Sequence, residues 1–206
     1  INRNHELITM DLYQHVTELF HSNIDVAMRS MDELPAVISD CGEMLTQCLL
    51  GERKILCCGE ANGAALAQIF ASNLLNRFNY ERPSLPAIAL SADATTITAI
   101  SSDGPFSEVF AKQIRALGQP GDILLLISNT APSNTYLQAI QAAHDREMQV
   151  ISIGCGNQHD SSALLLPEDI EVCVPTESRA RASEAQLLII NCLCDLIDTQ
   201  LFGTEE

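Results

Sequence analysis

The stretch with the clearest capacity for chemistry is the loop CGEANGAA at residues 58–65. It lies between an apolar run typical of a buried strand and a run with helical periodicity. Many α/β proteins bind a phosphate at this place, with backbone amides and a helix N-terminus. The loop also carries the carboxylate of Glu60, which opposes an anion. The structural alternative is that Glu60 complements the positive end of the following helix, an interaction worth about 0.3 to 1 kcal/mol.

A second loop, SNTAPS at residues 128–133, follows the apolar run DILLLI and carries three hydroxyl groups, those of Ser128, Thr130 and Ser133. Hydroxyls beside a helix N-terminus can bind an anion. Ser133 is also a suitable N-cap for the helix that follows, so the loop has an ordinary structural interpretation as well.

The hydrophobic pattern predicts the elements that bring these loops together. Strands are expected at residues 54–58, 87–90, 122–127, 150–153 and 170–174, and helices at 10–31, 34–50, 64–78, 95–101, 107–117, 134–147 and 182–201. Unbroken apolar strands separated by helices indicate a parallel sheet covered on both faces, with ligands at the carboxyl ends of the strands. We therefore predict an α/β three-layer sandwich with a central parallel sheet flanked by helices, preceded by a helical N-terminal segment.

Composition restricts the partners of the chain. Its 206 residues, 47% of them hydrophobic, suit a single domain that spans residues 1–206. The formal charge of −16, from 27 acidic and 11 basic residues, makes direct binding to nucleic acid unfavourable. This charge predicts an acidic, soluble surface, with a basic protein partner as the alternative.

The cysteines and histidines argue against a metal centre. The eight cysteines lie within apolar runs and form no C-x-x-C pair, which predicts reduced thiols in a core. The five histidines are isolated from one another: His5, His15, His21, His144 and His159. No positively charged start followed by an apolar signal core is present, so the sequence predicts a cytoplasmic protein that does not span a membrane.

Longer runs carry a family resemblance. These are KILCCG at residues 54–59, NRF at 76–78, ERPSLPAIAL at 81–90, KQIRALG at 112–118 and NCLCDLID at 191–198. On these runs the chain resembles the SIS (sugar isomerase) domain family, is similar to phosphoheptose isomerases, and is closer to their noncatalytic relatives, the DnaA initiator-associating proteins of the DiaA type. The resemblance implies a homotetramer or dimer, with residues 1–50 used in oligomerisation and residues 51–206 forming the α/β core with its C-terminal helix.

The resemblance also implies where catalysis would occur. The isomerases use a Glu and His pair, often with zinc, and a Gln and a His on the last helix; the matching positions here hold Ile69, Asn73, Ser183 and Asn191. Ile and Asn neither exchange a proton near neutral pH nor bind zinc strongly. We therefore expect no catalytic residue, no metal, no cofactor and no isomerase activity. The acidic side chains that could substitute are Glu60, Asp93, Asp103, Glu177 and Glu184.

The anion loops depart from the family pattern too. Where the family's first loop resembles G-N-G-x-S, this chain has Glu60 and, at the hydroxyl position, Gly63. Ala131 and Pro132 replace a Gly-Asn pair in the second loop, which removes a backbone donor. Residual binding of a phosphosugar would rest on Asn62, Gly63, Ser128, Thr130 and Ser133.

These departures favour one function and leave others open. We expect a noncatalytic oligomeric adaptor that binds the N-terminal domain of the DnaA replication initiator and promotes its assembly at the origin. The resemblance places that contact at Leu201 and Phe202, whose alternative role is hydrophobic capping of a helix. The alternative function is a phosphoheptose (sedoheptulose phosphate) isomerase or a phosphosugar-binding sensor. A DNA-reading regulator is less favoured, because the chain has no room for a helix-turn-helix domain.

Overall fold

A computed structural model describes residues 11–129, 133–156 and 164–203 of the chain. Its centre is a five-stranded sheet with the strand order β2-β1-β3-β4-β5. All four strand pairs are parallel. The strands are β1 (Ile55–Gly59), β2 (Ala87–Ala89), β3 (Ile123–Ile127), β4 (Gln149–Cys155) and β5 (Ile170–Val174).

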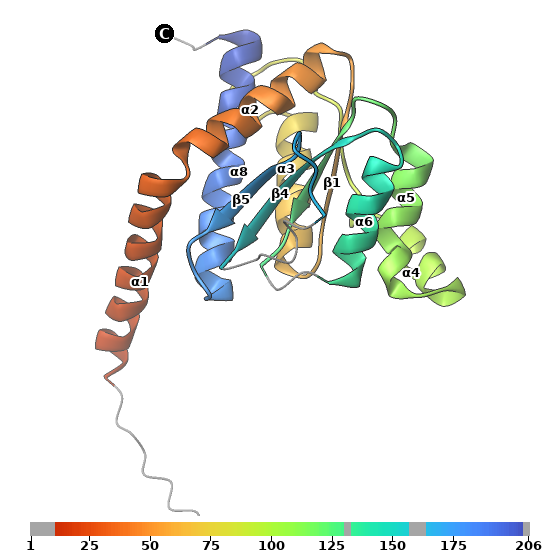
Figure 1. The fold of residues 1–206 in the computed structure, drawn as a ribbon. Helices are drawn as coiled ribbons and strands as arrows, with labels where there is room; N and C mark the ends of the chain where they lie inside the picture. Colours follow the sequence, from red (N-terminus) through yellow and green to blue (C-terminus); the bar gives the residue numbers. More distant parts are fainter. Residues whose placement is uncertain (1–10, 130–132, 157–163, 204–206) are drawn as a thin grey trace, which may run out of the picture.

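Helices cover both faces of this sheet (Figure 1). One layer contains α1 (Leu12–Glu33), α2 (Pro35–Leu50), α3 (Asn62–Leu75) and α8 (Arg179–Phe202). The other contains α4 (Ala94–Asp103), a 3₁₀ turn at Phe106–Glu108, α5 (Val109–Leu117) and α6 (Asn134–His144). The three-layer α/β sandwich predicted from the hydrophobic pattern is confirmed, and the expected helices and strands are present with shifts of a few residues at their ends.

The core is divided by the sheet. Cys57 belongs to the apolar cluster shared with α3 and α8, whereas its neighbour Cys58 belongs to the cluster shared with α5 and α6, because successive strand side chains alternate between faces. The eight cysteines all lie among the described residues, and none of them forms a disulfide. Burial raises the pKa of Cys41 to about 12 and that of Cys48 to about 11, so both remain protonated at neutral pH.

The strand order creates a switch point beside β1. The chain passes from β1 to β2 on one side and later places β3 on the other side of β1. Parallel α/β sheets bind ligands outside the carboxyl ends of the strands at such a point, because the connecting helices diverge there. The two loops with anion-binding potential, after β1 and after β3, both lie at this position.

Helix α8 contacts the three other helices of its layer, α1, α2 and α3. It is long and apolar enough to cross a membrane by length and composition. However, it packs against α2, α3 and the sheet, and it carries the buried side chains of Gln186 and Asp198. Asp198 forms an ion pair with Arg82, in which Nε and Oδ1 are 2.9 Å apart. These features are those of a core helix in a folded domain.

Candidate functional site

The loop after β1 is short and tightly packed. β1 ends at Gly59 and α3 begins at Asn62, with Ala61 between them at φ 49° and ψ −120°. A Cβ atom on Gly63 would lie 2.2 Å from the carbonyl oxygen of Ile127, at the end of β3. Residue 63 is therefore glycine because the start of α3 lies directly against β3, which leaves no space for a side chain.

Two amide side chains converge on one hydroxyl at this edge of the sheet. Asn62 Nδ2 at the start of α3 donates to Ser183 Oγ over 3.2 Å, and Asn129 Nδ2 after β3 donates to the same oxygen over 2.9 Å. Ser183 itself donates to the carbonyl oxygen of Arg179 in the first turn of α8. The fold thus brings together polar groups from the first loop, the second loop and the last helix.

Gln186 lies one turn further along α8 and is fully buried. Its Nε2 donates to the carbonyl oxygen of Ser128 over 2.6 Å and lies 3.4 Å from the carbonyl oxygens of Ile153 and Gly154. It therefore ties the end of β3 to β4. Among the described residues, Gln186 Oε1 has no hydrogen-bond partner, so a buried acceptor remains next to the switch point.

Glu60 contacts the second loop rather than its own helix. Its Oε2 accepts a hydrogen bond from Ser133 Oγ over 2.7 Å. Its backbone N–H donates to Tyr136 Oη over 2.9 Å, and Tyr136 Oη lies 3.4 Å from the carbonyl oxygen of Ile127. Burial raises the pKa of Tyr136 to about 12, which keeps its hydroxyl protonated. The structural alternative, in which Glu60 complements α3, is corrected: its carboxylate lies at the N-terminus of α6.

The structure brings together several of the residues singled out from sequence. Ser133 caps α6 by accepting from the N–H of Tyr136, as predicted. Asn62 is exposed, whereas Gly63 and Ser128 are buried. Thr130, Ala131 and Pro132 lie outside the described residues.

Sequence reasoning missed Asn129, Tyr136 and Gln186 as parts of this site. Gln186 had a detectable signal, because a glutamine interrupts the apolar pattern of the last helix. Tyr136 had a weaker signal, an aromatic hydroxyl in the first turn after a polar loop. Asn129 was part of the quoted loop, but nothing local distinguished it from its neighbours.

Three of the four positions that correspond to isomerase catalysis lie away from the amide cluster. Ile69 is partly exposed on α3, and Asn73 Nδ2 lies 3.8 Å from Cys194 Sγ on α8. Asn191 lines an apolar groove beside Cys192, on the outer side of α8. Ser183 is the one of the four that lies in the amide cluster. In the described parts of the chain, no three His, Cys, Asp or Glu side chains come together in a way that could hold a metal.

The acidic side chains proposed as substitutes are scattered. Asp93 caps α4, and the hydroxyl of Thr96 lowers the pKa of its carboxyl group. Glu184 accepts a hydrogen bond from Asn23, which joins α1 to α8, and a second one from Arg181 within α8. Glu60 is the substitute that the structure places beside the second loop.

The two apolar residues assigned to initiator binding differ in their surroundings. Leu201 packs against the core cluster, whereas Phe202 is exposed at the last position of α8. Just beyond them, Tyr80 Oη donates to the carbonyl oxygen of Gly203 over 3.0 Å. Whether the pair binds a protein stays a prediction of the sequence.

Comparison with known proteins gives a consistent result. A model of the SIS domain matches residues 19–155. The chain is 49% identical to a phosphoheptose isomerase of Chromohalobacter salexigens, over 96% of this chain and 100% of that protein. Its fold is similar to a phosphoheptose isomerase from Francisella tularensis, with a TM-score of 0.87 and 37% identity over 92% of this chain and 100% of that one. A phosphoheptose isomerase from Neisseria gonorrhoeae gives a TM-score of 0.86 and 35% identity, over 91% and 99% of the two chains.

These similarities overturn the adaptor function expected from sequence. The relatives at 35% to 49% identity, matched over nearly their whole length, are phosphoheptose isomerases rather than adaptors of a replication initiator. The physical reason for the error lies in the runs that suggested the adaptor. Two of them form the fully buried strand β1 and the core-facing part of α8, and such segments report packing rather than activity.

Proposed function

Because this chain belongs to the SIS domain family and is similar to phosphoheptose isomerases, we propose that it binds a phosphorylated sugar at the carboxyl ends of β1 and β3. One observation carries the proposal: Asn62 and Asn129, from two different loops, converge on Ser183 Oγ at the switch point of the sheet. Neutral amides and a hydroxyl are suited to the hydroxyl groups of a sugar. The substrate class is that of the relatives, a ketose or aldose phosphate of the heptose type.

The surroundings of this cluster supply a further requirement. The first turn of α6, capped by Ser133, offers a helix N-terminus for the phosphate. The amide cluster and this helix N-terminus follow adjacent strands of the sheet, so they offer hydrogen-bonding groups for the sugar and for the phosphate.

Isomerisation of the bound sugar is the second candidate, favoured by the 49% identity to a phosphoheptose isomerase. The reaction moves a proton between adjacent carbons and needs a positioned base. Ile69, Asn73, Ser183 and Asn191 provide no base. Of the acidic side chains that could substitute, Glu60 is the one that contacts the second loop, at Ser133, so we propose it as the base. Its contact with Ser133 must then break first. We rank binding above turnover for this reason.

Calorimetric titration with sedoheptulose 7-phosphate tests the proposed site. We expect binding to the wild-type chain and an affinity reduced about three- to tenfold in Ser183→Ala, since the hydroxyl that positions Asn62 and Asn129 is lost. Ser102→Ala is the matched control: Ser102 Oγ donates to the carbonyl oxygen of Thr98 within α4, so the affinity should not change.

The same samples separate binding from catalysis. Conversion of the ketose to the aldose phosphate, followed by NMR, would establish the isomerase, and loss of conversion with retained binding in Glu60→Gln would assign the base. Absence of any heat of binding at millimolar sugar phosphate would refute the proposed site.

We also propose that the chain assembles with copies of itself. In α1, Val26 is the buried residue, while Phe20 and Met31 are 69% and 64% exposed. Figure 1 shows α1 projecting along the side of the body. A row of exposed apolar residues follows the helix: Leu12, Val16, Leu19, Phe20, Ile24, Met28 and Met31. A helix with such a row needs a covering surface.

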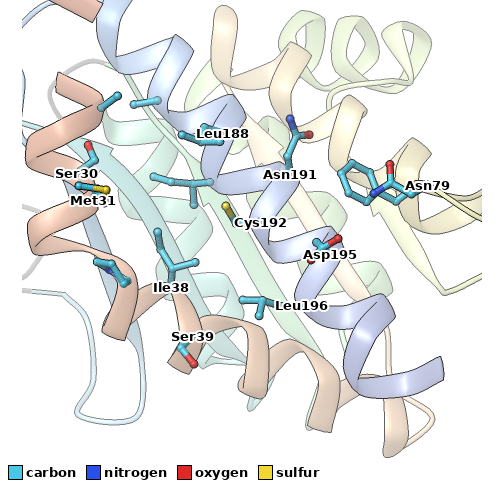
Figure 2. Close-up of a pocket in the computed structure, with 15 residues that line it drawn as sticks. Ser30, Met31, Ile38, Ser39, Asn79, Leu188, Asn191, Cys192, Asp195 and Leu196 are labelled. Carbon is cyan, nitrogen blue, oxygen red and sulfur yellow. The ribbon is translucent and has the colours of Figure 1, made fainter. Parts of the chain in front are cut away.

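That row is continuous with an apolar groove between α1, α2 and α8, shown in Figure 2. The groove has a volume of about 660 Å³, and Met31, Ile38, Leu188 and Cys192 line it. Met31 belongs to both surfaces, so a two-fold partner can place its own α1 row against the groove while its groove receives the row of the first copy. The family resemblance predicts a homotetramer, with a dimer as the alternative.

Multi-angle light scattering measures the mass of the assembly and so the number of chains in it. The wild-type chain should elute with the mass of a tetramer or dimer at micromolar concentration. Phe20→Asp combined with Leu188→Asp should shift it toward the monomer, because two charges would be buried without partners. A monomer mass for the wild-type chain contradicts the assembly.

The proposed location is the cytoplasm. The eight cysteines, all among the described residues, are thiols outside any disulfide. Such thiols persist in a reducing compartment.

A further inference from the structure

We propose that Glu60 is a built-in competitor for the phosphate group: its carboxylate occupies the position at the N-terminus of α6 that the ligand's phosphate would take. Binding of a sugar phosphate then requires that Glu60 leave this position. This inference rests on the proposed function. It adds a residue that weakens the binding of anionic ligands relative to neutral ones.

The contacts of Glu60 are those that an anion would make. Its Oε2 accepts the hydroxyl of Ser133 over 2.7 Å, and Ser133 is the N-cap of α6. The first turn of a helix carries a partial positive charge and favours an anion. Because a phosphate at this helix would need the same hydroxyl, carboxylate and phosphate exclude one another.

The charge of Glu60 is not neutralised by a basic side chain. The ion pairs of the described residues do not include Glu60. A phosphate that approached the start of α6 would meet the carboxylate directly, and like charges at such short range repel strongly in a partly buried site. A neutral sugar would not meet this repulsion.

The loop is built so that Glu60 is held from both sides. Its backbone N–H donates to Tyr136 Oη, which belongs to the same helix α6. The next residue, Ala61, has a positive φ of 49°, a conformation that non-glycine residues rarely adopt. The carboxylate therefore reaches α6 because the backbone of residues 60 and 61 is fixed against that helix.

Glu60→Gln tests this inference, because it removes the charge and keeps the size of the side chain. We expect sedoheptulose 7-phosphate and inorganic phosphate to bind at least about tenfold more tightly to the variant than to the wild-type chain, by calorimetry. The affinity for unphosphorylated sedoheptulose should change less than about twofold, since no anion is involved.

Thermal melts give an independent measure with a matched control. Glu60→Ala removes the carboxylate from the N-terminus of α6. Inorganic phosphate should therefore raise the Tm of this variant more than the Tm of the wild-type chain. Asp93→Ala removes a carboxylate from the N-terminus of α4, where Asp93 accepts hydrogen bonds from Thr95 and Thr96. Phosphate should give this variant no added stabilisation, because Asp93 bonds residues of its own helix rather than a second loop.

The outcomes separate this inference from the proposed function. Equal affinity of wild-type and Glu60→Gln for the sugar phosphate overturns the competitor and leaves the proposed function standing. A gain for inorganic phosphate without any sugar binding supports the competitor and refutes the sugar site. If neither probe binds either protein, both are refuted.

Discussion

Asp198→Ala is expected to destabilise the folded chain by about 3 to 5 kcal/mol, because it leaves a buried guanidinium without its counter-charge. The side chains of Arg82 and Asp198 are 1% and 2% exposed. Arg82 also donates to the carbonyl oxygens of Asn73 and Leu74 at the end of α3. The pair therefore joins α8 to α3 and supports the layer that holds the proposed site. Chemical denaturation at one protein concentration measures the loss, which corresponds to roughly 10 °C in Tm for a domain of this size.

Two comparisons make this prediction specific. Glu81→Ala breaks the exposed pair with Arg77, whose partners are 49% and 86% exposed, and should cost less than about 1 kcal/mol. Asp198→Asn should be intermediate, since it removes the charge but retains a hydrogen-bond acceptor for Arg82. A cost for Asp198→Ala no larger than that of Glu81→Ala would show that the pair does not support the fold.

Gly63→Ser is expected to destabilise the chain by about 3 kcal/mol or more, even though it restores the hydroxyl of the family's loop pattern. The new Cβ would lie 2.2 Å from the carbonyl oxygen of Ile127, and the atom it meets is rigid backbone. Overpacking against backbone must shift α3 away from β3, with a cost at the upper end of the usual range. The measurement is urea denaturation, together with a phosphate titration of the variant.

The matched control is Ala65→Ser, which adds a hydroxyl two residues later at an exposed position of α3. It should change the free energy of unfolding by less than about 0.5 kcal/mol. Wild-type stability in Gly63→Ser, with a gain in phosphate affinity, would show that the loop can reopen into an anion site and that the close approach is not a constraint.

The elements of the fold could be predicted because their signals are local. The apolar run at β3 and the alternation of strands with helices depend on residues that are close together in the sequence. The structure has the same elements. Ser133 was recognisable as an N-cap for the same reason, since a serine before a helical run satisfies the first free amides.

The site was only partly predictable. Asn62 and Ser133 were named from their loops, but Ser183 was considered only as a lost catalytic position. In the structure it accepts from Asn62, 121 residues earlier in the chain. No pattern in either segment indicates this contact, because it depends on how α8 crosses the carboxyl ends of β1 and β3.

The functional error has a related cause. The runs that favoured an adaptor include β1 and part of α8, whose side chains are mostly buried. The residues of a buried run reflect how the core packs. They do not distinguish an enzyme from a noncatalytic relative, and full-length similarity was needed to show the isomerase relationship.

The sequence by itself determined the alternating strands and helices, the parallel sheet and the acidic, reduced character of the chain, because periodicity, composition and capping act over a few residues. Only the tertiary structure decided the role of Glu60. From sequence Glu60 either opposes an anion at its own loop or complements the helix that follows it, yet its carboxylate lies at Ser133, 73 residues away. A carboxylate is stabilised by whichever helix N-terminus the packed sheet brings within hydrogen-bond distance, and that choice depends on the register of β1 and β3 rather than on the order of residues along the chain.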